Sequence, residues 1–344
     1  MNVLFVGLGS IGQRHLRNLL ELKKQDLNIF AYRVRGAQFV LDNKLNVLDG
    51  ETLESRYPIT ICSSLEDAWA HQIDIVFICN PNHLHYDILL QAAEHSCDIF
   101  VEKPVSINIC GLDKVEDLCN RNNLITFVGY QNRFHPCIQE AKRIIENQEI
   151  GHVVCINAEL GEDVRIWHKY EDYRTMYACH KDQGGGVILC QIHELDYIPY
   201  LLSSMPHSVF AVGGKLSNLD IDVEDVASIL LTFEQNGRRI PVHIHEDYLQ
   251  NPPSRCCKII GSEGRIEFDL LNSKLVQYNA VGQAVLEQRY AFERNDMFIR
   301  EMQLFLNAVE TRAESCINLS EGIKSLKIAL AAKRSLENHA IVAL

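Results

Sequence analysis

The chain has 344 residues, of which 45 are acidic and 33 basic, so its formal net charge is −12 and its isoelectric point is near 5.6. With 47% hydrophobic and 23% charged residues, the composition is that of a globular protein and excludes a disordered or low-complexity chain. The acidic balance argues against a nucleic-acid or anionic-membrane partner, because both require a basic surface. The length predicts about two domains.

The sequence gives no indication of export or of membrane insertion. The apolar run at residues 1–7 is too short for a signal peptide, and no run of about 18 apolar residues predicts a transmembrane helix. Twelve cysteines are scattered from Cys62 to Cys316 without a CxxC pair, which is typical of reduced thiols in a cytoplasmic protein. No metal site is expected, because the histidines form no ligand ladder and His243 and His245 alternate on one predicted strand face.

The first 130 residues are predicted to alternate between strands and helices. Short apolar runs predict strands at Val3–Val6, Asn28–Tyr32, Ile59–Cys62, Ile73–Cys79, Ile99–Val101 and Ile125–Tyr130. Amphipathic stretches predict helices at Ile11–Leu22, Leu65–His71, Leu84–Glu94 and Leu112–Arg121. Fully apolar strands separated by helices indicate a parallel sheet covered on both faces. Residues 33–58 show no regular pattern and are left without an assignment.

The rest of the chain has a different pattern and is predicted to form a second, α+β domain over residues 131–344. Long strands are predicted at Val153–Leu160, Ser208–Lys215, Val226–Glu234, Arg238–Tyr248, Arg255–Gly261 and Arg265–Leu271. Asn236-Gly237 between two of them is a hairpin signal, because both residues tolerate a positive φ. One helix is expected at Val187–Leu202, and two more close the chain. We therefore expect a large, mostly antiparallel sheet with helices on one side.

The first strand leads directly into Gly7-Leu8-Gly9-Ser10-Ile11-Gly12, and an amphipathic helix follows. Glycines at these positions permit a tight turn, close approach of a pyrophosphate to the backbone, and close packing of helix on strand. The start of the helix then offers N–H groups and a positive dipole end to the phosphates. Between a strand and a helix of an alternating pattern, this motif predicts a Rossmann-type, doubly wound dinucleotide-binding domain over residues 1–130.

The end of the second predicted strand bears on the choice between NAD and NADP. An NAD site usually has an acid about 20 residues after the glycines, but here Arg33 and Arg35 occur and no acid comes before Asp42. A guanidinium suits a ribose 2′-phosphate, so the sequence leans slightly to NADP. The alternative is that both arginines are solvated loop charges and that the site does not discriminate between NAD and NADP.

Polar residues also follow the fourth and fifth predicted strands, where ligands of such sheets bind. The set of motifs resembles the Gfo/Idh/MocA family of oxidoreductases over essentially the whole chain. The resemblance comprises, in order, the glycine motif, Asn80-Pro81-Asn82 with His85, Glu102-Lys103-Pro104, Arg133-Phe134, Gly184-Gly185-Gly186 with His193, Pro252-Pro253-Ser254-Arg255 and the turn Gly261-Ser262-Glu263-Gly264. The glycine and hairpin details are most similar to members associated with bacterial surface-polysaccharide and nonulosonic-acid sugar pathways.

The resemblance implies a role for individual residues. Lys103 matches the family lysine that lies beside the nicotinamide and hydrogen-bonds the reacting hydroxyl group, and His193 matches the histidine that acts as its acid or base. These two are the predicted catalytic residues, and the resemblance implies a cis peptide before Pro104. The cofactor side is predicted to comprise Gly7, Gly9, Ser10, Ile11, Gly12, Arg33, Asn80, Pro81, His85, Glu102 and Pro104. The substrate side is predicted to comprise Arg133, Cys190 and Tyr248.

The sequence departs from the family pattern just before His193. Members often have an aspartate there, whereas Cys190 occupies the nearest position and the stretch from Gly186 to His193 is one residue short. A thiol does not orient an imidazole as a carboxylate does. Glu194 flanks His193, but adjacent residues of a helix face different directions. For His193, and likewise for Arg133 and Tyr248, a purely structural role is the alternative.

The predicted function is therefore an NAD(P)-dependent oxidoreductase that transfers hydride between nicotinamide and a secondary alcohol or ketone of a sugar, nucleotide sugar or polyol. The alternatives are a hydrolase or epimerase that uses bound NAD without net redox change, or a non-catalytic dinucleotide-binding protein. The expected partners are a small sugar-type substrate and further copies of the chain, as a homodimer or homotetramer formed through the C-terminal sheet.

Overall fold

The computed structural model describes residues 1–23, 26–34 and 39–344, and these form two compact units. Unit 1 comprises Met1–Tyr130, His168–Asp172 and Phe298–Ile323, and unit 2 comprises Gln131–Trp167, Tyr173–Met297 and Lys324–Leu344. All residues after 130 are predicted from the sequence to belong to the second domain. The contacts instead return Phe298–Ile323 to the first unit, far from residue 130 in the chain.

Unit 1 contains a six-stranded parallel sheet with the order β5-β2-β1-β6-β7-β8. Its strands are β1 (Asn2–Val6), β2 (Asn28–Tyr32), β5 (Ile59–Cys62), β6 (Ile75–Ile78), β7 (Asp98–Val101) and β8 (Thr126–Val128). The doubly wound parallel sheet predicted from the apolar runs is confirmed. Because the strand order reverses between β1 and β6, the carboxyl ends of these two strands form the switch point at which such sheets bind ligands.

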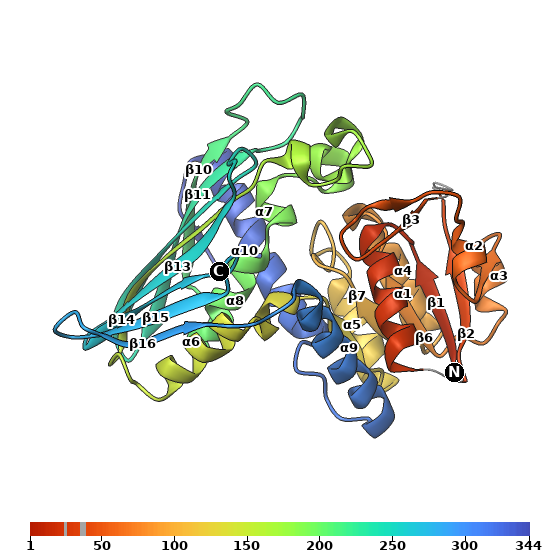
Figure 1. Ribbon diagram of the computed structural model, residues 1–344, viewed down its shortest axis with the longest axis horizontal. Helices are drawn as coiled ribbons and strands as arrows, with labels where there is room; N and C mark the ends of the chain where they lie inside the picture. Colours follow the sequence, from red (N-terminus) through yellow and green to blue (C-terminus); the bar gives the residue numbers. More distant parts are fainter. Residues whose placement is uncertain (24–25, 35–38) are drawn as a thin grey trace. The chain divides into compact units, whose positions relative to one another are not determined.

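The helices of unit 1 lie on the connections between these strands (Figure 1). They are α1 (Ser10–Leu22), α2 (Leu53–Arg56), α3 (Leu65–Trp69), the 3₁₀ turn η1 (Asn82–Leu84), α4 (His85–Glu94) and α5 (Leu112–Arg121). The stretch 33–58, for which the sequence predicted no element, contains two short strands, β3 (Val40–Leu41) and β4 (Val47–Leu48), which pair antiparallel.

The returning segment completes the core of unit 1. Helix α9 (Arg294–Thr311) places the edge of the Phe305 ring against Phe77 and Phe100, with ring centroids 5.7 and 5.5 Å apart. Beyond the helix, the Val128 N–H donates to the Ile317 carbonyl at 2.9 Å. Burying an aromatic side chain stabilises a fold by about 1.5–3 kcal/mol, so this segment is part of the hydrophobic core of the unit.

Unit 2 contains a nine-stranded sheet with the order β16-β15-β14-β13-β9-β12-β11-β10-β17. Its strands are β9 (Val153–Gly161), β10 (Ser208–Gly214), β11 (Val226–Gln235), β12 (Arg238–Asp247), β13 (Ser254–Gly261), β14 (Gly264–Asp269), β15 (Lys274–Asn279), β16 (Ala284–Arg289) and β17 (Val342–Ala343). All neighbours are antiparallel except β9 and β12. The predicted hairpin is confirmed, since Asn236 and Gly237 have φ values of 52° and 72°.

Helices cover one face of this sheet (Figure 1). They are η2 (Gln131–Phe134), α6 (Pro136–Glu146), α7 (Val187–Cys190), α8 (His193–Leu202) and α10 (Leu319–Asn338), of which α10 belongs to unit 2 from Lys324. The prediction of a single helix at Val187–Leu202 is wrong in one respect. It is broken at Gln191, whose φ and ψ of −100° and 23° leave the helical range, so His193 starts a new helix.

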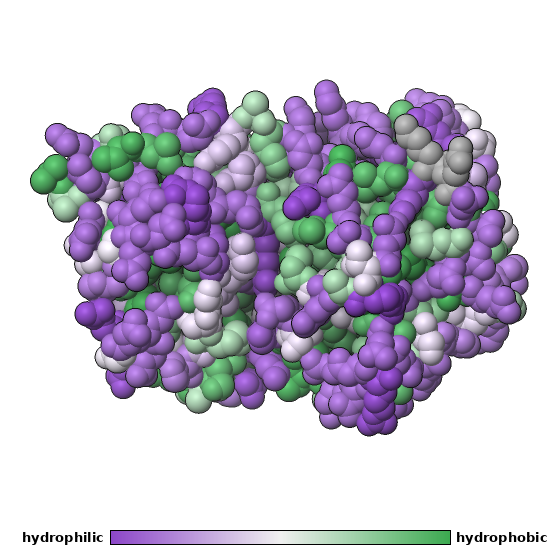
Figure 2. Space-filling model, turned by 90° about the horizontal axis from the view of Figure 1, so that it is seen from below, coloured by the Kyte–Doolittle hydropathy of each residue, from purple (hydrophilic) through white to green (hydrophobic). Residues whose placement is uncertain are grey.

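One face of the molecule is mixed in character. On the face drawn in Figure 2, hydrophilic and hydrophobic residues are interspersed. Within the described residues, no helix combines the length and the hydropathy that crossing a membrane requires.

Candidate cofactor and substrate sites

The glycine-rich turn joins β1 to α1, and its three glycines differ in their surroundings. Gly7 has a φ of +93°, and a Cβ atom there would lie 2.8 Å from the Asn80 nitrogen. A Cβ atom on Gly12 would lie 2.2 Å from the Gly7 carbonyl oxygen, so the third glycine is needed for close packing of helix and strand. Gly9 has no atom within 4 Å of its Cβ position. The glycine of the motif that faces open space is therefore Gly9.

The residues around this open space fit a dinucleotide. Helix α1 begins at Ser10 and Ile11 with Gly9 as its N-cap, and no side chain caps it. Its first N–H groups and the positive end of its dipole therefore favour an anionic ligand. The Oδ1 atom of Asn80, at the end of β6 beside Gly7, is buried and has no hydrogen-bond partner among the described residues. The N–H groups at the helix start suit a pyrophosphate, and the orphaned Asn80 oxygen suits a hydrogen bond donated by a ribose hydroxyl group.

At the end of β2, Arg33 is paired with an acid that sequence reasoning did not find. Its Nη2 atom donates to Oε1 of Glu54 in α2 at 2.6 Å, and the two side chains are 13% and 44% exposed. Glu54 lies 21 residues after Arg33 in a stretch without a regular pattern, so no local signal connects the two. Arg35, the other arginine predicted here, lies outside the described residues.

His85 fastens together the loops that follow β6 and β7. Its Nδ1 atom lies 2.7 Å from the Pro104 carbonyl oxygen, and its Nε2 atom lies 2.8 Å from that of Asn80. Burial lowers the pKa of this imidazole, although the two backbone contacts act in the opposite direction. Pro81 precedes η1 in the first loop, and the Lys103–Pro104 peptide of the second loop is cis, as the resemblance implied. With both ring nitrogens on main-chain carbonyls, His85 holds the loops in place and is not placed to move a proton.

Glu102 is buried directly before the predicted catalytic lysine. Its Oε1 atom lies 2.7 Å from Nε2 of His15, and its Oε2 atom accepts the backbone N–H of Lys103 at 3.3 Å. A Cβ atom on Gly129 would lie 3.0 Å from Oε1, so a glycine there leaves room for the carboxylate. These contacts fix the main chain at Lys103. A direct contact of Glu102 with a cofactor stays a prediction.

In unit 2, His193 is the first residue of α8 and is 6% exposed. The Gln131 side-chain amide, from η2, lies 3.3 Å from Nε2 of His193. If the amide oxygen faces the ring, it accepts the Nε2–H and leaves Nδ1 as the basic nitrogen. Such a contact fixes the orientation of the imidazole, a role that Cys190, in the place of the family aspartate, does not fill. Gln131 was not among the predicted site residues, although it adjoins the Arg-Phe motif.

Cys190 ends α7, and its thiol lies beside the hydroxyl group of Tyr248. Tyr248 is fully buried, donates to the Ala178 carbonyl at 3.4 Å, and contacts the ring of Trp167 edge to face at 5.1 Å. Burial, and then Cys190, raise the pKa of this phenol well above its usual value. Tyr248 therefore stays protonated near neutral pH and is a poor acceptor of a proton from substrate.

Arg133 forms a buried ion pair with Asp196. Its Nε and Nη2 atoms donate to the two carboxylate oxygens at 2.9 and 2.8 Å, and Ser325 donates to one of the same oxygens at 2.8 Å. Glu194, the other acid near His193, accepts two bonds from Arg255 at 2.9 Å each. The acids that flank His193 are thus engaged by arginines, and a substrate contact of Arg133 stays a prediction. Removing one partner of such a buried pair costs about 3–5 kcal/mol.

Comparisons with known proteins agree with this arrangement. Residues 1–130 match the model of the oxidoreductase family with an NAD-binding Rossmann fold, and residues 138–267 match the GFO/IDH/MocA C-terminal domain. An uncharacterized oxidoreductase, YrbE of Bacillus subtilis, is 27% identical over 96% of this chain and 93% of its own. Myo-inositol 2-dehydrogenase of Thermotoga maritima is 25% identical over 100% of this chain and 98% of its own. The crystal structure of myo-inositol 2-dehydrogenase from Lactobacillus plantarum has a TM-score of 0.77 at 22% identity and covers 100% of this chain and 99% of its own.

The parallel sheet, its glycine turn and the large second sheet define an oxidoreductase with an NAD-binding Rossmann domain. The chain belongs to the Gfo/Idh/MocA family. The narrower likeness to members of sugar pathways of the bacterial surface stays a prediction.

Proposed function

We propose that the protein transfers hydride between a nicotinamide dinucleotide and a secondary alcohol or ketone of a sugar, nucleotide sugar or polyol. The observation that carries this proposal is the open space at Gly9, at the uncapped start of α1 and next to the orphaned Asn80 oxygen. The inositol dehydrogenases among the relatives support a polyol-type substrate.

Lys103 and His193 are the groups that we propose to act on the reacting hydroxyl group. The bound nicotinamide supplies or accepts the hydride. When hydride leaves the carbon, the attached oxygen becomes negative and loses its proton. The Lys103 ammonium opposes the negative charge. The His193 imidazole takes the proton on Nδ1 when Gln131 presents its amide oxygen to the Nε2–H. Of the predicted substrate residues, Cys190 and Tyr248 are proposed to shape the pocket wall beside α7 rather than to exchange protons.

The cofactor preference depends on the Arg33–Glu54 pair. The guanidinium favours the 2′-phosphate of NADP, and the carboxylate opposes it by charge and suits the ribose hydroxyl groups of NAD. We propose that the protein accepts both dinucleotides with a slight preference for NADP, and that Glu54 limits this preference.

We further propose that copies of the chain associate through the sheet of unit 2. The face opposite its helices carries apolar and polar side chains side by side, including Val212 and Leu230, which are 59% and 44% exposed, and His243 directly across from Leu230. Exposed apolar residues on a broad sheet face favour burial against a second copy.

The test of the catalytic proposal is steady-state kinetics after a screen of sugars, nucleotide sugars and polyols for a change in nicotinamide absorbance. His193→Asn is expected to lower kcat by about 10²–10⁴-fold, because it removes proton transfer while cofactor affinity stays the same. Lys103→Met is expected to lower kcat comparably, because alkoxide stabilisation is lost. His207→Asn, at a histidine whose side chain is 64% exposed, is the matched control. Full activity of His193→Asn would rule out its assigned role.

A further inference from the structure

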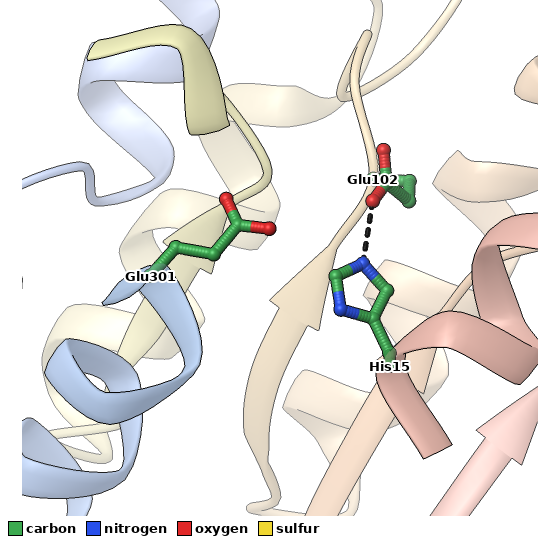
Figure 3. Close-up of side chains that lie close together, drawn as sticks. All are labelled: His15, Glu102 and Glu301. Carbon is green, nitrogen blue, oxygen red and sulfur yellow. Dashed lines mark hydrogen bonds and ion pairs between the residues drawn. The ribbon is translucent and has the colours of Figure 1, made fainter. Parts of the chain in front are cut away.

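Three titratable side chains meet in the interior of unit 1, and the proposed reaction uses none of them directly (Figure 3). His15 comes from α1, Glu102 from the end of β7 and Glu301 from α9. His15 and Glu301 are completely buried, and Glu102 is 7% exposed. One nitrogen or oxygen atom of each lies within 4.8 Å of those of the other two.

The hydrogen bonds within this triad are uneven. His15 Nε2 and Glu102 Oε1 are 2.7 Å apart, and the second oxygen of Glu102 accepts the Lys103 backbone N–H. In contrast, both oxygens of Glu301 and the Nδ1 atom of His15 have no hydrogen-bond partner within the described part of the chain. Figure 3 shows the Glu301 carboxyl group directed toward the other two side chains. A carboxyl group that points at a carboxylate and lacks a donor of its own is disfavoured as an anion.

The surroundings of the triad strengthen this argument. The His15 ring lies against Phe100, with centroids 4.7 Å apart, and near Phe298 at 6.0 Å. Among the described residues, the buried thiol of Cys79 also lies near the two carboxyl groups, and burial, Glu102 and Glu301 raise its pKa. The Arg14 guanidinium lies over the neighbouring Phe298 ring, 4.8 Å from its centroid. Burial, and then the charge of Glu102, raise the pKa of Glu301 well above its usual value.

We propose that Glu301 is a positioning residue for Lys103 that works as a neutral carboxylic acid. With Glu301 uncharged, Glu102 is the single anion of the triad, and it stays bonded to His15 and to the Lys103 backbone. Ionising Glu301 places a second buried negative charge beside Glu102, displaces its carboxylate and releases the peptide that carries the lysine. The effect on turnover rests on the proposed function of Lys103, whereas the neutral state of Glu301 does not.

The first test follows unfolding by denaturant from pH 5 to pH 9 and requires no substrate. If Glu301 is neutral, the folded protein retains a proton that the unfolded chain releases above its ordinary carboxyl pKa. The contribution of protonated Glu301 to the free energy of unfolding is then fully present below that ordinary pKa. It is lost as pH rises toward the raised pKa of the folded state. Relative to Glu301→Gln, which cannot ionise, the unfolding equilibrium constant of the parent protein should increase about tenfold per pH unit across this window. Glu310→Gln removes an acid that is 56% exposed on the same helix, and it should keep a constant difference from the parent.

The second test is an infrared spectrum of the intact parent protein at pH 8. A protonated-carboxyl band that shifts in D2O should persist there, and Glu301→Gln should remove it. If the variant fails to fold, absence of the band from the parent protein still overturns the proposal, and loss of the band in the folded variant assigns it to Glu301. Absence of the band at pH 8, or a Glu301→Gln variant whose stability difference from the parent is constant with pH, overturns the proposal.

The third test separates positioning from mere packing. Glu301→Ala should lower kcat about 10- to 100-fold with unchanged dinucleotide affinity, because a small displacement of a catalytic group is costly, and Glu301→Gln should restore it. Equal loss in both variants contradicts a neutral positioning role.

The same three side chains are also a possible ligand set for a transition metal. One equivalent of metal in the purified protein, measured by mass spectrometry and lost in Glu301→Gln, would therefore also overturn the proposal. If Lys103→Met proves fully active while the infrared band is present, the proposed function fails and the neutral state of Glu301 stands.

Discussion

Replacing Glu54 with glutamine provides a direct test of the cofactor preference. In the structure its carboxylate holds the Arg33 guanidinium at 2.6 Å. Glu54→Gln keeps the shape of the side chain and removes its charge, so the Arg33 guanidinium loses this ion pair and its positive charge is less compensated near a 2′-phosphate. We expect NADP to bind more tightly and the affinity for NAD to change little.

The size of the effect follows from two contributions. The pair is partly exposed, at 13% and 44%, so freeing the guanidinium is worth about 0.2–1 kcal/mol. Removing repulsion between the carboxylate and the phosphate adds about 1 kcal/mol after screening by water and salt. Together these give about 1–2 kcal/mol, or roughly a 5- to 30-fold gain in NADP affinity relative to NAD.

The assay is fluorescence titration with NADPH and NADH at two salt concentrations. Glu51→Gln is the matched control, because Glu51 has the same charge and lies nearby but pairs with Arg56. Arg33→Met should shift the preference in the opposite direction. An unchanged ratio of the two affinities in both Glu54→Gln and Arg33→Met would show that this pair does not contact the ribose end of the cofactor.

Two further predictions concern the glycine turn and the open sheet face. Gly9→Val should abolish dinucleotide binding in a titration while the melting temperature stays close to that of the parent, because the new side chain occupies open space. Gly12→Val is unsuitable for this purpose, because its side chain would meet the Gly7 carbonyl, and a Gly9→Val variant that binds normally would contradict the assignment of the turn. Leu230→Lys should shift the oligomer toward monomer in light scattering with the fold retained, since a charge in an apolar contact is costly. An unchanged mass would exclude this face as the interface.

Much of unit 1 was predictable because its signals are local. The strands of the parallel sheet are short apolar runs, and Gly7 and Gly12 occur where their neighbours leave no room for a side chain. The break at Gln191 was not predictable from periodicity, since the apolar pattern continues through it. It results from a local change in φ and ψ at a position where the sequence has no glycine or proline to indicate a helix break.

The missed site residues are those brought in by tertiary contacts. Glu54 reaches Arg33, and Glu301 reaches Glu102, from stretches where an isolated acid has no distinguishing pattern. Gln131 was close to a recognised motif, but its orientation toward His193 depends on how η2 packs against α8. Arg133 was predicted to contact substrate because it belongs to a recognised motif. In the structure its guanidinium is paired with Asp196, a tertiary contact that the motif does not reveal.

The return of Phe298–Ile323 to the first unit has a consequence for protein synthesis. Domains generally fold as units while the chain emerges from the ribosome, N-terminal first. Here the aromatic rings of Phe77 and Phe100 lack Phe305, and β8 lacks its bond to Ile317, until these residues are translated, well after the strands of the parallel sheet. Until then, the nascent Rossmann sheet exposes the apolar rings that Phe305 later covers. During that interval, the exposed apolar face of the sheet is a binding surface for a chaperone that recognises apolar surfaces.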